Sequence, residues 1–137
     1  MDRKDLQELS TIRLKEAASL LKLEMFDGAY YLAGYAVECG IKACIAKRTQ
    51  RGEFPDKKRA ESSHSHNLWV LIRVADLDRA CQEKAAVDPE FGANWRTVQS
   101  WSELSRYRRN HRESAETLLG AVGDRRHGVI TWIRRQW

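Results

Sequence analysis

Apolar residues recur at three- and four-residue spacings along the first part of the chain. Over residues 5–23 they leave charged side chains on the remaining positions, which predicts an amphipathic helix. Residues 28–47 are apolar nearly all round, and many of their side chains are small. Because small side chains let neighbouring helices approach closely, we expect this second helix at the centre of a bundle, with Asp27 capping its N-terminus.

The helical pattern breaks over residues 49–65, where Gly52, Pro55 and a run of charged and polar residues replace the apolar period. We predict a mobile loop there. Short helices are predicted over residues 67–74, 78–83, 89–99 and 102–109, and a longer last helix over residues 114–136. No strand-like alternation appears in the sequence. The predicted fold is therefore all-α, with residues 1–137 forming one domain, a four- to five-helix up-and-down bundle.

The composition fits one small globular domain. The chain has 137 residues, and 42% of them are hydrophobic, which is enough for a core. Its charged start predicts no signal peptide. Glu38 and Lys42 interrupt the most apolar stretch, residues 29–46, and favour a buried helix over a membrane span. Three cysteines, an odd number without zinc-site spacing, fit a reducing cytoplasm, and we expect neither a metal nor a cofactor.

Positive charge is concentrated near the C-terminus. Of a net charge of +5, residues 101–137 supply eight arginines and four acidic residues, a balance of +4, and they contain no lysine. Guanidinium groups stay charged and bind phosphate through two parallel hydrogen bonds, so this segment indicates a phosphate-bearing partner such as a nucleic acid. The alternative is that these arginines are solvated or lie at helix ends as partners of the helix dipole.

Three segments carry a family resemblance: AYYLAGYAVECGIK at residues 29–42, HNLWVL at 66–71, and WSELSRY at 101–107 ahead of a last helix ending in Trp132 and Ile133. Together they resemble HEPN domains (higher eukaryotes and prokaryotes nucleotide-binding) over residues 6–133. The resemblance implies a helical bundle that forms a homodimer. It also implies an RNA-binding protein that acts as a metal-independent endoribonuclease, often a toxin in toxin–antitoxin or defence systems. The alternative is a non-catalytic HEPN module that binds a nucleotide or a partner nucleotidyltransferase.

Active HEPN ribonucleases carry an arginine followed, after four to six residues, by a histidine, and Arg106 and His111 match this signature with four residues between them. The resemblance implies that Arg106 clamps the phosphate and that His111 is the general acid or base. Both roles suit the chemistry, because histidine exchanges protons near neutral pH and arginine stabilises developing negative charge. The residue after the arginine is Tyr107, where active members commonly have Asn, Asp or His. Alternatively, then, Arg106 and Tyr107 are structural and His111 is incidental.

Helical geometry limits how this motif can work. Residues five apart lie about 140° from each other on a straight helix of 3.6 residues per turn. Either the helix ends between Arg106 and His111, near Asn110, or two subunits share one site. Three further arginines are expected to line the RNA path: Arg108, Arg109 and Arg112.

Two residues outside the motif also bear on the site. Glu38 is expected either to pair with Lys42, four residues on, or to orient Arg106. His66 is expected to be a residue of the loop or of the following helix start.

Overall fold

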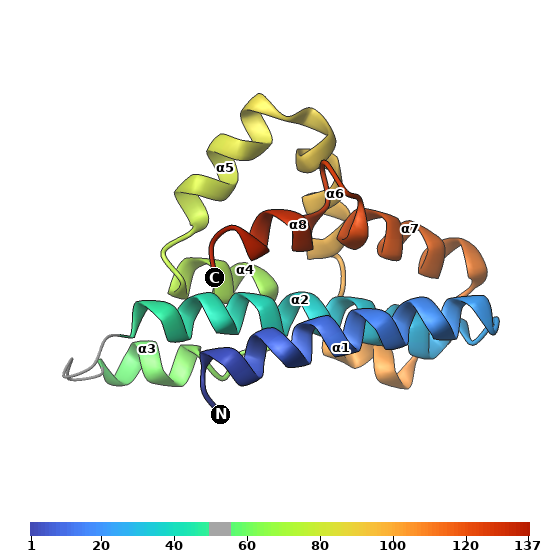
Figure 1. Cartoon of the computed structure of the whole chain (residues 1–137), viewed down its shortest axis with the longest axis horizontal. Coiled ribbons are helices and arrows are strands. Elements are labelled where there is room, and N and C mark those ends of the chain that lie inside the picture. Colours follow the sequence, from blue (N-terminus) through green and yellow to red (C-terminus); the bar gives the residue numbers. More distant parts are fainter. Residues whose placement is uncertain (50–55) are drawn as a thin grey trace.

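The computed structural model describes residues 1–49 and 56–137, and within these ranges it contains eight α-helices, one 3₁₀ helix and no strand. The all-α prediction is confirmed. The helices in these ranges are more numerous and shorter than a four- to five-helix bundle requires. The two longest, α1 (Arg3–Lys22) and α2 (Phe26–Arg48), form an antiparallel hairpin along one side of the molecule (Figure 1).

Short polar contacts set the ends of this hairpin. Asp2 and Asp5 cap α1 reciprocally, each side chain accepting the other's backbone N–H at 2.9 Å. The turn between the helices passes through Glu24, which has a positive φ of 61°. Met25, not Asp27, is the N-cap of α2, so the predicted capping role of Asp27 is wrong. Asp27 lies in the first turn of α2, where its carboxylate faces the segment that follows the 3₁₀ helix.

The predicted central position of α2 is confirmed, because it packs against α1 and against four later elements. Its small residues allow close approach. A Cβ atom built on Gly34 would lie 2.2 Å from the indole ring of Trp101, and one on Gly40 would lie 3.1 Å from Ile133. Close to Gly40, Ser10 of α1 donates its buried hydroxyl to the carbonyl of Ala36 at 2.7 Å.

Shorter elements complete the chain after α2: α3 (Lys57–Ser62), α4 (Leu68–Val74), α5 (Asp78–Val87), α6 (Pro89–Gln99), the 3₁₀ helix η1 (Glu103–Tyr107), α7 (Arg112–Gly123) and α8 (Val129–Arg134). The prediction of a loop over residues 49–65 is wrong for α3. Asp56 starts this helix by accepting the backbone N–H of Arg59, a local cap that the apolar pattern does not reveal. Residues 50–55 of that predicted loop lie outside the described ranges.

The predicted last helix, residues 114–136, is two helices. Asp124 accepts the backbone N–H groups of Arg126 and His127 at 2.9 and 2.6 Å, which closes a turn in place of another helical turn. Gly128 then passes so close to this turn that a Cβ on it would lie 2.3 Å from the Asp124 carbonyl oxygen. The helix is therefore interrupted between α7 and α8, and α8 packs against α2 (Figure 1).

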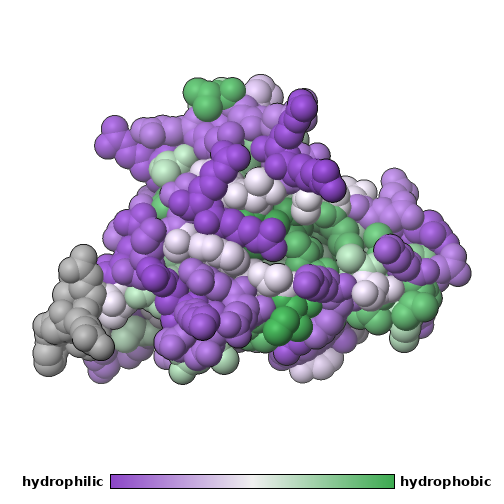
Figure 2. All heavy atoms as spheres, viewed as in Figure 1, coloured by the Kyte–Doolittle hydropathy of each residue, from purple (hydrophilic) through white to green (hydrophobic). Residues whose placement is uncertain are grey.

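Hydrophilic side chains cover most of the face shown in Figure 2, and hydrophobic ones gather toward its middle and near the turn between α1 and α2. At that turn, Leu23 and Met25 are 68% and 56% exposed. Within residues 1–49 and 56–137, no helix combines the length and the apolar character needed to cross a bilayer.

Candidate functional site

One side of α2 gathers the residues that the sequence singles out. Residues recurring at intervals of three and four lie on the same side of a helix. We call this side the α2 face and define it by five residues: Asp27, Tyr31, Tyr35, Glu38 and Lys42. Three later parts of the chain contact it: the segment 101–107 containing η1, the segment 108–110, and the residue before the N-cap of α4.

Arg106 lies in η1, exposed, beside Tyr31 of the α2 face. Its guanidinium carbon is 4.8 Å from the ring centroid of Tyr107, which is itself 75% exposed. The neighbouring Tyr107 side chain, and after it that of Tyr31, raises the pKa of the Arg106 guanidinium. The arrangement offers a permanent cation next to an exposed aromatic ring.

A row of stacked aromatic rings runs from the core onto the α2 face. The ring of Tyr31 stacks on Trp101 at 6.1 Å with an interplanar angle of 28°, and on Tyr35 at 6.0 Å and 13°. Trp101 is buried against Gly34, whereas the two tyrosines are half-buried. Trp101 therefore anchors the row, and the tyrosine rings carry it to the surface.

His111 is separated from Arg106 by a break in helical structure. The 3₁₀ helix ends at Tyr107. Both Arg108 and His111 have an extended backbone, and His111 is the N-cap of α7 without a side-chain capping bond. Of the two geometries expected from the spacing, the structure has the one in which the helix ends between the two residues. The His111 side chain is exposed.

Two of the three arginines expected to line RNA have carboxylate partners in the α1–α2 hairpin. Arg109 pairs through Nε with Asp27 at 2.8 Å, and the backbone N–H of Asn110 donates to the same carboxylate. Arg112 pairs with Glu24 and lies over the ring of Phe26, its guanidinium carbon 4.8 Å from the centroid. These contacts fasten the segment between η1 and α7 to the start of α2.

Arg108 differs from these two arginines. Its side chain is exposed, and no described residue forms an ion pair with it. Of the three predicted RNA contacts, it is therefore the one whose charge a ligand would meet without first displacing a carboxylate.

Glu38 is buried, with 1% of its surface exposed, and two side chains reach its carboxylate. Lys42 Nζ lies 3.4 Å from Oε2, and His66 Nδ1 lies 3.0 Å from Oε1. The expected pair with Lys42 is thus present. For the alternative, that Glu38 orients Arg106, the described residues show no contact: the side-chain partners of the Glu38 carboxylate are Lys42 and His66.

His66 is the partner of Glu38 that the sequence pattern does not indicate. His66 directly precedes Asn67, which caps α4 by accepting the backbone N–H of Val70 at 3.1 Å. A buried carboxylate needs hydrogen-bond donors, so Glu38 within an apolar helix was the signal that a second donor had to come from elsewhere.

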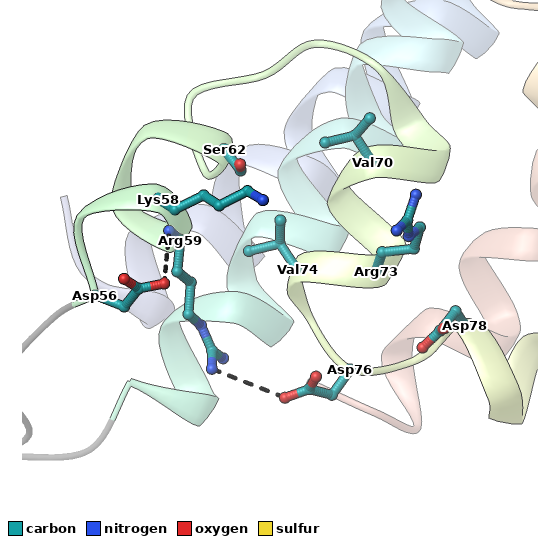
Figure 3. Close-up of a pocket in the computed structure, with 9 residues that line it drawn as sticks. All are labelled: Asp56, Lys58, Arg59, Ser62, Val70, Arg73, Val74, Asp76 and Asp78. Atoms are coloured by element: carbon teal, nitrogen blue, oxygen red, sulfur yellow. Dashed lines mark hydrogen bonds and ion pairs between the residues drawn. The ribbon is translucent and has the colours of Figure 1, made fainter.

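A separate cleft of about 530 Å³ opens between α3 and α4 (Figure 3). Its charged lining residues are three basic and three acidic: Lys58, Arg59, Arg73, Asp56, Asp76 and Asp78. Two of these acidic residues already have partners within the protein: Asp56 caps α3, and Asp76 lies 3.8 Å from Arg59. The cleft therefore has no excess charge with which to attract an anion or a cation.

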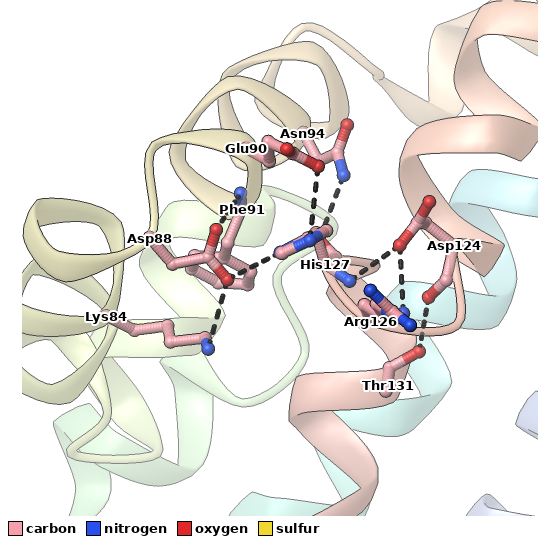
Figure 4. A network of polar contacts seen from close by, with 9 residues as sticks. All are labelled: Lys84, Asp88, Glu90, Phe91, Asn94, Asp124, Arg126, His127 and Thr131. Carbon is pink, nitrogen blue, oxygen red and sulfur yellow. Dashed lines mark hydrogen bonds and ion pairs between the residues drawn. The ribbon is translucent and has the colours of Figure 1, made fainter.

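Away from the α2 face, a cluster of polar contacts around His127 joins the corner between α5 and α6 to the turn between α7 and α8 (Figure 4). His127 lies between two carboxylates, with Nδ1 2.8 Å from Asp88 and Nε2 3.1 Å from Glu90. The hydrogen bond to Asp88 raises the pKa of His127, and the same contact holds the pKa of Asp88 far below its usual range. Because both ring nitrogens are engaged, this cluster fastens two parts of the fold together.

The α2 face and the segments that contact it therefore combine an exposed arginine, stacked tyrosines and a histidine held by a buried carboxylate. The resemblance of the sequence to HEPN domains stays a prediction. Comparison of the chain with protein-family models, curated proteins and solved structures finds no match.

Proposed function

We propose that this chain is a HEPN-like RNA-binding protein with metal-independent endoribonuclease activity, and that RNA lies along the α2 face. The observation that carries the proposal is the exposed Arg106 guanidinium next to Tyr107 and the stacked Tyr31 and Tyr35. Single-stranded RNA is bound by cations that hold its phosphates and by aromatic rings on which its bases stack. Both elements occur side by side here, supplied by residues far apart in the sequence.

Cleavage of RNA without a metal needs a base for the 2′-hydroxyl proton, a proton for the leaving 5′-oxygen and a cation for the charge that builds on the phosphate. Arginine suits the last task because its fixed donors match phosphate oxygens. Histidine suits proton transfer near neutral pH. The site offers two exposed imidazoles for this task, His111 at the start of α7 and His66 beside Glu38.

A second function is favoured by the contacts of the arginine-rich segment. Arg109 and Arg112 are already paired with carboxylates, which leaves less free positive charge near His111 than the sequence implies. This favours a non-catalytic HEPN module that binds a nucleotide or a partner nucleotidyltransferase. In either case we expect a homodimer, and in the toxin–antitoxin case a nucleotidyltransferase antitoxin.

Incubation with a mixed single-stranded RNA in excess EDTA separates the two functions. The ribonuclease proposal predicts cleavage by the wild-type protein and a large loss of cleavage in Arg106→Ala. The matched control is Arg96→Ala, which removes another exposed arginine, on α6 away from the α2 face. RNA that is bound but not cleaved would contradict the ribonuclease activity and favour the non-catalytic module, and RNA that is neither bound nor cleaved would contradict the RNA-binding proposal as a whole.

A further inference from the structure

The contact between His66 and Glu38 fixes which nitrogen of the imidazole faces solvent. Nδ1 lies 3.0 Å from the buried carboxylate, and the His66 side chain as a whole is 49% exposed. A carboxylate accepts hydrogen bonds, so the neutral imidazole carries its hydrogen on Nδ1. Nε2 then presents a lone pair, and no described residue forms a hydrogen bond with it.

The other three histidines lack this arrangement. His127 has both ring nitrogens engaged, by Asp88 and Glu90. His64 and His111 are exposed, and within the described ranges no carboxylate fixes either ring. Orientation by a carboxylate on Nδ1, with Nε2 left open, is the arrangement by which proteins present a histidine as a proton acceptor. In the described part of the chain only His66 combines the two.

His66 and Arg106 lie on the same side of α2 at a separation that suits a short stretch of RNA. Glu38, the partner of His66, follows Tyr31, the neighbour of Arg106, by seven residues, which is about 10 Å along the helix. The ring of Tyr35 lies between them. An oligonucleotide laid along α2 would place a phosphate at Arg106, a base on the tyrosine rings and the reacting ribose at His66, so that within one subunit Arg106 holds a phosphate next to the one that is cleaved.

His111 lies nearer the other end of the α2 face. The residue before it, Asn110, is bonded to Asp27, which precedes Glu38 by eleven residues, or about 16 Å along the helix. Within one subunit, His66 and His111 therefore serve different positions on a bound RNA.

We propose that His66, held by Glu38, is the general base of RNA cleavage, a role that the sequence motif gives to His111. This inference rests on the proposed ribonuclease function. Nε2 of His66 takes the proton of a ribose 2′-hydroxyl, and the 2′-oxygen forms a bond to the adjacent phosphorus. The bond from phosphorus to the 5′-oxygen breaks, and that oxygen takes a proton from water. The products are a 2′,3′-cyclic phosphate and a 5′-hydroxyl, and Glu38 acts as a positioning residue.

The test measures kcat and KM for cleavage of a fluorogenic oligoribonucleotide in excess EDTA. His66→Gln keeps an N–H group for Glu38 but has no basic nitrogen. We expect kcat to fall about 100-fold with KM unchanged, as is usual for loss of a general base. The exposed control His64→Ala should stay near the wild-type kcat. Added imidazole should restore part of the activity of His66→Ala, a rescue that loss of a merely structural side chain would not show.

Glu38→Gln tests the positioning role, and its kcat should fall with KM unchanged. Wild-type cleavage that depends on His111 and not on His66 would overturn this inference and leave the proposed ribonuclease standing. RNA binding without cleavage by the wild-type protein would overturn the inference together with the ribonuclease activity. Circular dichroism melting of each variant shows that a loss of rate is not a loss of fold.

Discussion

His66 Nδ1 lies 3.0 Å from the Oε1 atom of Glu38, a carboxylate that is 1% exposed in the middle of the central helix. A carboxylate taken out of water must be paired and hydrogen-bonded, or its burial destabilises the fold. Lys42 supplies the second partner from one turn along the same helix. The contact therefore joins the start of α4 to α2 and fixes a histidine ring at the surface.

Replacing Glu38 by Ala should lower the free energy of unfolding by about 3 kcal/mol, because a hydrogen bond to a charged group is worth about 1.5 kcal/mol or more and the substitution removes two of them. Urea denaturation measures this change. The matched control is Glu83→Ala on α5, where Glu83 is 68% exposed and pairs with Arg79. That change should cost less than about 0.5 kcal/mol. Equal effects of the two substitutions would show that the Glu38 contacts do not stabilise the fold.

Gly34 should tolerate no side chain, because a Cβ there would lie 2.2 Å from the indole of Trp101. Gly34→Ala must displace Trp101 and the following η1, so we expect a loss of about 1–3 kcal/mol in unfolding free energy. Gly120→Ala is the control, since a Cβ on Gly120, in α7, meets no atom within 4 Å. It should raise stability by about 0.5–1 kcal/mol through helix propensity. Thermal melting of both variants checks the opposite signs.

The contact between Asp88 and His127 should make stability depend on pH at both ends of the range. His127 has a raised pKa when folded, so its contribution is complete below about 6.5 and is lost as pH rises through the folded value. Asp88 has a lowered pKa, so its contribution is complete above about 3.8 and is lost as pH falls. The urea concentration at the unfolding midpoint of the wild-type protein should therefore decrease when the pH is raised from about 5.5 to about 8.5.

His127→Gln should show a smaller change in that midpoint, because it removes the group that titrates at the alkaline end. His64→Gln, at an exposed histidine of the segment after α3, should follow the wild-type curve. Parallel curves for the wild type and His127→Gln would contradict the assigned role of this pair.

The three cysteines should react slowly in the native protein. All three are free and buried, and burial raises the pKa of the Cys39 and Cys44 thiols to about 11 and that of Cys81 to about 12. Because the thiolate is the reactive form, Ellman's reagent at pH 8 should label none of them quickly before unfolding, and all three in denaturant. Rapid labelling of a native thiol would show that its surroundings open readily.

The sequence predicts α2 well because the apolar residues of this helix are continuous and because its small side chains indicate close packing against neighbouring helices. It misses α3 and the split between α7 and α8, because these depend on single side-chain contacts, such as the one between Asp124 and the backbone of His127. Such contacts leave no periodic signal over a window of residues.

Only the local contacts of the candidate site could be predicted from the sequence. Arg106 and His111 belong to one local motif, and the ion pair of Glu38 with Lys42 follows from a four-residue spacing. The contact between Glu38 and His66 spans 28 residues and depends on how α4 packs on α2, so the sequence pattern alone does not reveal it.

Equilibrium binding of a labelled single-stranded RNA, followed by fluorescence anisotropy over a range of salt concentrations, tests the central claim most directly. If RNA lies along the α2 face, Arg106→Ala should weaken binding and reduce the slope of log K against log salt by about 0.7, the value for one phosphate contact on a single strand. Arg96→Ala should leave both the affinity and the slope unchanged. Equal affinity and slope for the wild type and Arg106→Ala would contradict RNA binding at this face.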